Sequence, residues 1–346
     1  MQKIIDLRSD TFSLQSDLMK QAMFSAKTGD DVYGEDVATN ELEQYAATLC
    51  AKEAALFTAT GTMGNLVSLL SYVPRGGEII LGKTSHIFLY EVGGAAALGS
   101  IVYHTVDDSS GMLIPEDTEN AIRHNDIFSP STALICLENT HNLAGGIASP
   151  PEAIVRVCEV ARKHALPVHL DGARIFNACV NFHVSVADYA REVDSIMITL
   201  SKGLGAPAGA IVAGKKEFIE KARKFRKMVG GGMHQSGYMA AMGLYALKNE
   251  MSQISTDNAN ARLLAEELNK LSCFDIKTGN NITNILYLWL KDKNDNALKY
   301  LPRFEEQGIK MLATERGYRA IIYNGITQDD IHFIIGQFKK IFSGKS

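Results

Sequence analysis

The sequence predicts an α/β protein built around a mainly parallel sheet. Short apolar runs alternate with longer amphipathic ones over the first two thirds of the chain, and this alternation is typical of a parallel sheet covered by helices on both faces. The 346 residues correspond to about two domains at roughly 150 residues each. Hydrophobic residues make up 46% of the chain and charged residues 21%, the balance of an ordinary globular protein.

Seven apolar runs are the candidate strands of this sheet. They are residues 54–58, 78–81, 100–104, 133–137, 166–170, 195–200 and 208–212. Helices are expected between them at 65–72, 87–98, 151–164 and 184–192. Pro150-Pro151-Glu152 is a favourable helix start, because proline suits the first turn and a carboxylate favours the positive end of the helix dipole.

The pattern changes after three consecutive glycines at 230–232. Helical runs at 234–248 and 258–270 lead to candidate strands near 284–290, 309–312 and 319–323, and then to a last helix at about 329–342. We therefore expect a large domain over 1–248, including the N-terminal segment, and a smaller α+β domain over 249–346. The first dozen residues show no clear element and could pack against either domain.

The charge balance argues against two classes of partner. Thirty-five basic and 39 acidic residues give a formal charge of −4, whereas a nucleic-acid or anionic-membrane surface needs clustered positive charge. A basic cluster at 221–227 is interpreted as a solvated helix face. We expect no nucleic-acid partner and no membrane association.

Cysteine usage and the N-terminus indicate a reduced, cytoplasmic protein. The five cysteines are an odd number without CxxC spacing, so neither a disulfide framework nor a zinc cluster is expected. His164, His169 and His183 lack HxH or HExxH spacing, so no metal site is expected. The first residues lack the features of a secretory signal, and no apolar run approaches the ~20 residues that span a bilayer.

Candidate functional residues follow three of the predicted strands. Asp171 and Lys202 are separated by about one strand–helix–strand unit of roughly thirty residues, so they should emerge at the same edge of the sheet. A Gly/Thr-rich turn at 58–65 follows a third strand and opens a helix. Ligands of open parallel sheets bind outside the carboxyl ends of the strands.

These three features together indicate pyridoxal 5′-phosphate (PLP). A helix N-terminus suits a phosphate, a lysine can form a Schiff base with an aldehyde, and an aspartate can keep a pyridine nitrogen protonated. The turn matches neither GxxxxGK nor GxGxxG, which disfavours a nucleotide or dinucleotide. Taken singly, Asp171 is more readily a turn or helix-cap residue and Lys202 a solvated charge, and the glycines Gly61 and Gly64 are as readily turn residues. Only their joint placement favours a cofactor.

Five longer segments carry a family resemblance. They are DLRSDT at 6–11, GDDVYGED at 29–36, LENTHN at 137–142, HLDGARIFNA at 169–178 and LSKGLGAP at 200–207. With them the chain resembles, nearly end to end, the low-specificity L-threonine aldolase family of the beta-eliminating lyase group. The resemblance implies the PLP-dependent transferase-like fold of aspartate aminotransferase (fold type I), with a seven-stranded, mainly parallel sheet.

The resemblance also implies roles for individual residues at the cofactor. Lys202 would be joined to the PLP aldehyde, and Asp171 would pair with the pyridine nitrogen and make the ring an electron sink. His86 would stack on the ring. The phosphate would be held by Gly61, Thr62 and Met63.

A second group of residues is implied at the amino-acid substrate. Arg174 would lie near the cofactor's phenolic oxygen and the substrate carboxylate, and Ser9 and Arg319 would bind that carboxylate. His141 would lie near the β-hydroxyl. Tyr33 would come from a neighbouring subunit, which implies a homodimer or homotetramer with active sites at the subunit interface.

The implied reaction is retro-aldol cleavage of L-threonine, L-allo-threonine or a related β-hydroxy-α-amino acid to glycine and an aldehyde. The base that takes the β-hydroxyl proton is expected to be His86 or His141, and the sequence does not separate them. Two other functions stay open. One is β-elimination from an aromatic or sulfur-containing amino acid, and the other is a non-catalytic PLP-binding protein.

Two positions depart from the family pattern. His234 stands where the family usually has arginine in Gly-Gly-Gly-Met-Arg-Gln, and Tyr323 stands where it has histidine in Arg-x-Val-Thr-His. Both changes are expected at the rim of the site, where they would affect the identity of the substrate more than the cofactor.

Overall fold

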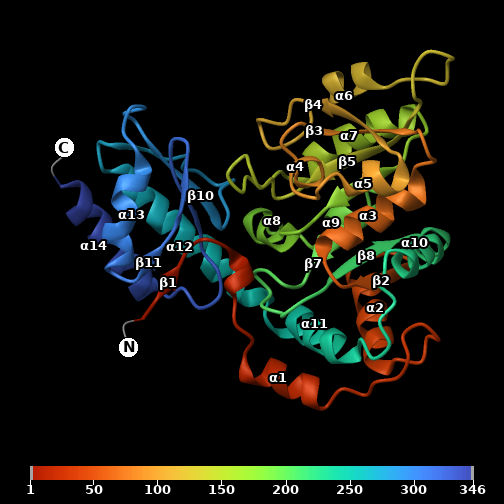
Figure 1. Ribbon diagram of the computed structural model, residues 1–346, viewed down its shortest axis with the longest axis horizontal. Coiled ribbons are helices and arrows are strands. Elements are labelled where there is room, and N and C mark those ends of the chain that lie inside the picture. Colours follow the sequence, from red (N-terminus) through yellow and green to blue (C-terminus); the bar gives the residue numbers. More distant parts are fainter. Residues whose placement is uncertain (1–2, 344–346) are drawn as a thin grey trace.

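The larger of the two main sheets has seven strands in the order β2-β8-β7-β6-β5-β3-β4 (Figure 1). All strands run parallel except β8, which is antiparallel to both of its neighbours. The computed structural model describes residues 3–343. The strands are β2 (Ala54–Thr58), β3 (Glu78–Gly82), β4 (Val102–Val106), β5 (Thr132–Glu138), β6 (Val168–Asp171), β7 (Ser195–Thr199) and β8 (Ala210–Gly214). The predicted α/β class and the mainly parallel seven-stranded sheet are confirmed.

Helices cover both faces of this sheet because alternate strand residues point to opposite sides. On one side Phe57 and Ile198 lie in a core shared with α2, α7, α8, α9 and α11. On the other side Leu56 and Met197 pack with α3 and α10, and Ile79 packs with α3 and α5. The bounds are α1 (Asp17–Phe24), α2 (Val37–Leu49), α3 (Gly61–Tyr72), α4 (His86–Leu89), α5 (Gly94–Gly99), α6 (Pro115–Ala121), α7 (Pro151–Lys163), α8 (Ile175–Phe182), α9 (Val186–Ala190), α10 (Lys216–Met228) and α11 (Gly237–Asn249).

The helix predicted at 87–98 is in fact two short helices, α4 and α5. Between them the chain turns at Val92 and Gly93, whose φ angles are 55° and 64°. A left-handed backbone interrupts the hydrogen-bond ladder of a right-handed helix. This turn leaves Val92 95% exposed while the preceding Glu91 is only 6% exposed. The break therefore directs a carboxyl group into the protein.

The C-terminal part of the chain forms a second, antiparallel sheet in the order β12-β13-β10-β9. The elements here are α12 (Met251–Asn269), β9 (Phe274–Asp275), β10 (Ile285–Leu290), a 3-10 helix (Ala297–Tyr300), α13 (Leu301–Glu305), β11 (Ile309–Lys310), β12 (Leu312–Thr314), β13 (Gly317–Ile321) and α14 (Gln328–Phe342). Its core includes the rings of Phe274, Phe304, Phe338 and Phe342. The sequence predicted a smaller α+β unit in this region, separate from the large sheet. The domain boundary at residue 248 stays a prediction.

The N-terminal segment, for which no element was predicted, contacts both units. Strand β1 (Ile5–Asp6) pairs in parallel with β11, so it lies in the C-terminal lobe (Figure 1). A 3-10 helix at Asp10–Phe12 follows, and Asp10 reaches Arg174 beside the large sheet. The segment thus crosses the space between the two lobes. Among the helices of residues 3–343, none has the length and apolar character needed to cross a bilayer.

Candidate active site

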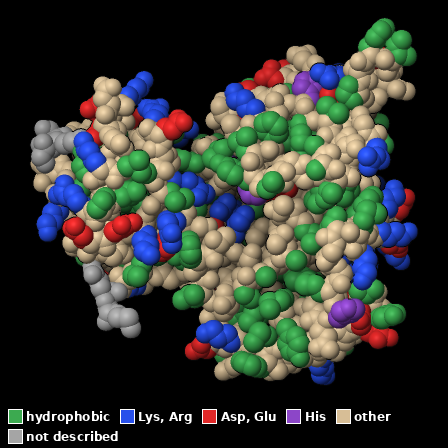
Figure 2. Space-filling view, in the orientation of Figure 1, with side chains coloured by type: hydrophobic (Ala, Val, Ile, Leu, Met, Phe, Trp, Pro, Cys, Tyr) green, Lys and Arg blue, Asp and Glu red, His purple; other side chains and the backbone are tan. Residues whose placement is uncertain are grey.

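A cleft of about 940 Å³ lies between the large sheet and the C-terminal lobe. Basic side chains and a histidine gather in the hollow between the lobes (Figure 2). The cleft is lined by Ser9, Thr11, Thr84, His86, Tyr90, Asn142, Leu143, Arg174, Lys202, Tyr287, Trp289, Leu312, Ala313, Thr314, Glu315, Arg316 and Arg319. Five residues singled out from the sequence are in this wall: Ser9, His86, Arg174, Lys202 and Arg319.

Neighbouring parallel strands bring the acidic and basic groups together. Glu138 ends β5, Asp171 ends β6, and these two residues are direct partners in the sheet. Lys202 follows β7, the next strand over. His86 begins α4 after β3, which lies on the other side of β5. The chain order reverses between β3 and β5, and such switch points are where open α/β sheets bind ligands.

Lys202 is held in a state suited to nucleophilic chemistry. Burial lowers the pKa of its amine, and the nearby Arg174 guanidinium lowers it further, against the opposing effect of Asp10 and Asp171. A lower pKa increases the fraction of neutral amine, the form that can attack a carbonyl carbon. This environment fits the role expected for Lys202.

Asp171 is buried beneath the cleft wall. Its Oδ2 accepts a hydrogen bond of 2.8 Å from Asn65 Nδ2, and its Oδ1 accepts one of 3.0 Å from the backbone N–H of Ala173. Two donors hold the carboxylate in one orientation. A carboxylate fixed in this way is what pairing with a ring nitrogen requires.

His86 is held from two sides by carboxylates. Its Nδ1 lies 3.1 Å from Oε1 of Glu91, and its backbone N–H donates a 2.6 Å hydrogen bond to Oε2 of Glu138. Glu138 also accepts a 2.8 Å hydrogen bond from the backbone N–H of Asn142. Burial raises the pKa of both the Glu91 and the Glu138 carboxyls. In the part of the chain that the structure describes, no group hydrogen bonds Nε2 of His86.

His86, Glu91 and Asp171 each offer one ligand atom, and these three atoms lie within 4.8 Å of one another. A metal ion is the first interpretation of such a group. Here the Glu91 and Asp171 oxygens already share the Asn65 amide as a donor, at 2.7 and 2.8 Å. The hydrogen bonds account for the grouping without an ion.

Arg174 is anchored by a bidentate pair with Asp10. Its Nε and Nη2 donate to the two Asp10 oxygens at 2.6 and 2.7 Å, and both residues are buried. Despite burial, the Asp10 carboxylate raises the pKa of Arg174, and Arg174 in turn lowers that of Asp10. The pair fixes the guanidinium plane at the cleft wall, and Nη1 has no hydrogen-bond partner among the described residues.

Arg319 carries a buried donor without an acceptor. Its Nη2 donates a 2.7 Å hydrogen bond to Oδ1 of Asn142, and its Nη1 reaches the carbonyl of Arg8 at 3.4 Å. Its Nε is buried and unpaired within the described residues. Buried donors are rarely left unpaired, and each one needs an explanation. A ligand with an anionic oxygen would satisfy this one.

The N-terminus of α3 provides backbone donors at the same edge of the sheet. Thr60 caps the helix, and its hydroxyl accepts the N–H of Met63 at 3.1 Å. This leaves Gly61 and Thr62 as the first-turn N–H groups that lack an intrahelical acceptor. A Cβ on Gly61 would lie 2.9 Å from Oγ1 of Thr199, so the close approach of helix and strand requires glycine. None of these residues lines the cleft wall itself.

His141 lies behind the cleft, not in its wall. It is almost fully buried, its Nε2 lies 2.8 Å from Oδ2 of Asp108, and its Nδ1 accepts the Ala144 N–H at 3.3 Å. Both ring nitrogens are therefore occupied. Gly82 makes room for this pair, because a Cβ there would lie 1.9 Å from Asp108 Oδ2.

Three other residues considered in the sequence lie outside the cleft wall of their own chain. Tyr33 is 80% exposed in the loop before α2. His234 is exposed and its Nδ1 lies 2.7 Å from Oδ2 of Asp30. Tyr323 is buried in the core of the smaller sheet, where burial raises its pKa to about 12. Neither departure from the family pattern therefore lines the cleft of its own chain.

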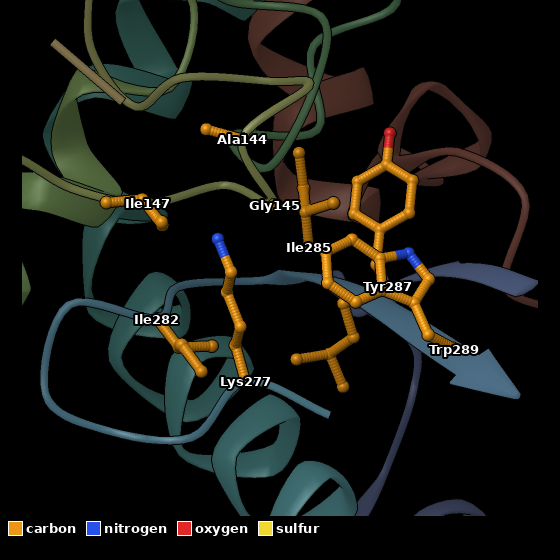
Figure 3. Close-up of a pocket in the computed structure, with 9 residues that line it drawn as sticks. Ala144, Gly145, Ile147, Lys277, Ile282, Ile285, Tyr287 and Trp289 are labelled. Carbon is orange, nitrogen blue, oxygen red and sulfur yellow. The ribbon is translucent and has the colours of Figure 1, made fainter. Parts of the chain in front are cut away.

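The C-terminal lobe contributes an aromatic wall. The rings of Tyr287 and Trp289 on β10 lie 6.3 Å apart, and Arg316 and Lys277 lie over the indole at 5.1 and 5.9 Å. Figure 3 shows Tyr287 and Trp289 side by side, with the Lys277 amine pointing toward Ala144. Cation–π contacts of this kind hold an indole in place. This wall faces the polar groups of the large sheet.

Several residues that shape the site had no role assigned from the sequence: Asp10, Asn65, Glu91, Asp108, Glu138 and Asn142. Three of them, Asp10, Glu138 and Asn142, stand within the family-like segments. Their position in those segments was an available signal. Most of their hydrogen-bond partners lie far away in the sequence and could not be inferred from spacing, whereas Glu91 and His86 are only five residues apart.

Comparisons with known proteins agree with this geometry. The family model for beta-eliminating lyases matches residues 6–290. Low-specificity L-threonine aldolase 1 of Arabidopsis thaliana is 40% identical over 97% of this chain and 96% of its own length. Low specificity L-threonine aldolase of Escherichia coli K12 is 44% identical over 85% of this chain and 87% of its own.

Solved structures confirm the fold. A threonine aldolase of Leishmania major superposes with a TM-score of 0.84 at 19% identity, covering 97% of this chain and 99% of that one. A structure described as SPT with a PLP internal aldimine superposes with a TM-score of 0.77 at 20% identity, covering 99% and 88%. With the family model and the relatives above, these findings lead to one conclusion: the chain belongs to the beta-eliminating lyase family and, within it, to the low-specificity L-threonine aldolases.

Proposed function

We propose that this chain is a PLP-dependent aldehyde lyase that cleaves L-threonine, L-allo-threonine or a related β-hydroxy-α-amino acid to glycine and an aldehyde. One observation carries the proposal. Lys202, His86, Arg174 and Arg319 share one cleft. Asp171 ends β6, Lys202 follows the neighbouring β7, and Arg319 comes from β13 of the C-terminal lobe. The family membership of the chain supports the same function.

The residues present fit the cofactor. Lys202 would hold its aldehyde carbon, Asp171 its pyridine nitrogen, and the first turn of α3 (Gly61, Thr62 and Met63) its phosphate. The orphaned Nε of Arg319 supports a ligand here, because a buried donor is rarely left unpaired. When bound, PLP supplies an electron sink for the pair of electrons left on the α-carbon.

The substrate carboxylate would be held by Arg319, Arg174 and Ser9. Two guanidinium groups with free N–H donors give a charge-assisted, directional site. By fixing the carboxylate, they orient the bond between the α- and β-carbons for cleavage, which is an effect of positioning. The aromatic wall of Tyr287 and Trp289 would contact the substituent on the β-carbon.

We propose His86, and not His141, as the group that accepts the β-hydroxyl proton. His86 lines the cleft and its Nε2 is available, whereas both ring nitrogens of His141 are engaged outside the cleft wall. A general base must reach the proton it removes. His141 would instead support the loop that carries Asn142 and so the orientation of Arg319.

Exposed apolar side chains support an oligomer. Five apolar side chains on the N-terminal segment, α1, the loop before α2 and the start of α2 are more than 40% exposed: Leu14, Leu18, Phe24, Tyr33 and Val37. Apolar patches of this kind mark interfaces. We propose a homodimer or homotetramer in which Tyr33 reaches a neighbour's cleft. Mixing Tyr33→Ala with Lys202→Ala subunits should then restore part of the activity, because hybrid dimers contain one intact site.

The remaining assignments concern location and partners. We propose that the protein works in the cytoplasm on small amino acids. None of its five cysteines, all in the described part of the chain, forms a disulfide, and four of them are buried. Fractionation of cells that express a tagged full-length chain would test the location.

The decisive assay incubates the PLP-loaded enzyme with L-threonine and L-allo-threonine and measures glycine and acetaldehyde. Formation of both products supports the proposal. Pyruvate and ammonia from tyrosine, tryptophan or cysteine would instead indicate β-elimination. Borohydride labelling of Lys202 without turnover of any amino acid would indicate a non-catalytic PLP-binding protein.

A further inference from the structure

Glu91 is a buried carboxylate that the reaction outlined above does not use. It is placed by the turn between α4 and α5, where the left-handed Val92 and Gly93 direct the Glu91 side chain inward. Burying a carboxylate is costly unless hydrogen bonds compensate for the lost water. Its contacts therefore need a reason beyond the turn itself.

Two donors converge on one oxygen of Glu91. Oε1 lies 3.1 Å from Nδ1 of His86 and 2.7 Å from Nδ2 of Asn65. Burial raises the pKa of Glu91, while the hydrogen bonds from His86 and Asn65 oppose that rise by favouring the ionised form. An ionised carboxylate only accepts hydrogen bonds, so Nδ1 of His86 must carry the hydrogen. In a neutral imidazole, the lone pair is then on Nε2, the nitrogen that has no partner among the described residues.

A hydrogen-bond chain behind Glu91 fixes the direction of every donor. Asn65 gives its two amide hydrogens to Glu91 and Asp171, and its Oδ1 lies 3.1 Å from Nε2 of His169. Burial lowers the pKa of His169 to about 4, so this ring is neutral and donates from Nε2. Its Nδ1 then accepts from the hydroxyl of Ser195 at 2.8 Å. The Asn65 amide cannot flip without losing these bonds.

We propose that Glu91 is a positioning residue that makes His86 the base of the reaction. Its carboxylate accepts the Nδ1–H, holds the ring in one tautomer and stabilises the imidazolium that forms when Nε2 takes the β-hydroxyl proton. The proton moves from the substrate oxygen to Nε2 as the bond between the α- and β-carbons breaks and the aldehyde leaves. A proton is then returned to the α-carbon, which completes glycine and leaves Nε2 free again. The inference rests on the proposed function and deepens it.

The charges around the two groups agree with this role. His86 is faced by Glu91, Asp171 and Lys202, and Glu91 is faced by His86 and Asp171, with Tyr103 and Cys136 close by. Burial opposes a charge on His86, but the hydrogen bond to Glu91 and the charges of Asp171 and Glu91 outweigh it and raise the pKa of His86. Removing the Glu91 charge should therefore make His86 less basic.

The test is Glu91→Gln, which keeps the size of the side chain and an oxygen acceptor but removes the charge. In the cofactor-free protein, the pKa of His86, followed by NMR of the labelled imidazole, should fall by about one unit. In the PLP-loaded enzyme, the acid limb of the pH profile of kcat should move to lower pH by the same amount. At neutral pH kcat should fall about 10- to 100-fold, by analogy with the loss of the outer partner of a metal-ligating histidine.

Glu78→Gln is the matched control. Glu78 is also a buried glutamate beside a histidine, with Oε1 lying 3.2 Å from Nδ1 of His104, but it is at the opposite end of β3 and outside the cleft. This variant should leave the His86 pKa and the acid limb unchanged. An equal shift in both variants would overturn the proposal, because the effect would then be a general loss of buried charge.

Two further variants keep the proposal falsifiable if Glu91→Gln folds poorly. Glu91→Asp retains the charge and should restore the acid limb at least in part. In a His86→Asn background, Glu91→Gln should cause no additional loss, because residues that act through one another are not additive. An unchanged His86 pKa in Glu91→Gln, or a further loss in the double variant, would overturn the proposal. The NMR titration is independent of turnover, so it separates this failure from a failure of the proposed function.

Discussion

The groups around the cleft and the core of the C-terminal sheet are both largely buried, but the first are charged and the second are aromatic. In the cleft, Arg174 pairs with Asp10, and three carboxyls lie around His86. In the C-terminal core, Phe338 packs against Phe304 and Phe342 at ring separations of 4.6 and 6.1 Å. Buried charges are weak contributors to stability because desolvation offsets their attraction, whereas packed rings contribute strongly. The cleft thus serves chemistry and the aromatic core serves stability.

The largest expected effect is on the cleft side. Lys202→Ala should lower turnover about 10⁴-fold or more, because no other group could hold the cofactor aldehyde, while thermal stability changes little. Glycine formation and borohydride labelling measure the loss of turnover and of the link to the cofactor, and a melting curve measures thermal stability. Exposed Lys224→Ala is the control. A fully active Lys202→Ala enzyme would contradict the assignment of this lysine.

Phe338→Ala tests the other side of the comparison. Removing a fully buried ring should cost about 3–5 kcal/mol of unfolding free energy. The activity of the folded fraction should be unchanged, because Phe338 lies outside the cleft wall. Phe333→Ala on the same helix is 41% exposed and should cost far less, which denaturant titrations of both variants would show. Equal losses of unfolding free energy in the two variants would mean that the core around Phe338 does not stabilise the fold.

Arg319→Lys should give an intermediate effect. Lysine keeps the charge but loses the planar fork, so kcat/KM should fall about 10- to 100-fold, mainly through a higher KM. Steady-state kinetics with L-threonine measure this. Arg316→Lys, which alters the contact with Trp289 at the mouth of the cleft, should change kcat/KM much less. A similar loss in both would argue against a carboxylate site at Arg319.

Asp257→Asn should have the smallest effect on activity and sharpen the comparison, because this buried carboxyl lies outside the cleft wall. Burial raises the pKa of Asp257 to about 7, and only Gln253 donates to it among the described residues. Between pH 4 and 7 the unfolded chain releases this proton while the folded one retains it, so stability falls as pH rises. The variant should be more stable than the parent protein at pH 8 and equally stable at pH 4 in denaturant titrations. A gain that is equal at both pH values would contradict the shifted pKa.

The strands were predictable because their signal is local. All seven apolar runs overlap observed strands of the large sheet, and Pro150-Pro151 starts α7 as expected. The helix predicted at 87–98 was wrong in its middle, because a left-handed turn at Val92 and Gly93 allows Glu91 to be buried. Tertiary contacts outweighed a favourable local pattern there.

Residue spacing alone predicted that Asp171 and Lys202 lie at one edge of a parallel sheet, since neighbouring strands end together. The family-like segments added the fold type and the candidate residues. Folding in three dimensions decided that Asp10 pairs with Arg174, that β1 joins β11, and that His86 faces the cleft while His141 is enclosed. Periodicity and turn chemistry act over a few residues, so they can be read from the sequence. The pairings of Asp10 with Arg174 and of β1 with β11 join segments more than a hundred residues apart, and the difference between His86 and His141 depends on which ring nitrogens are already occupied. Tertiary packing alone determines these features.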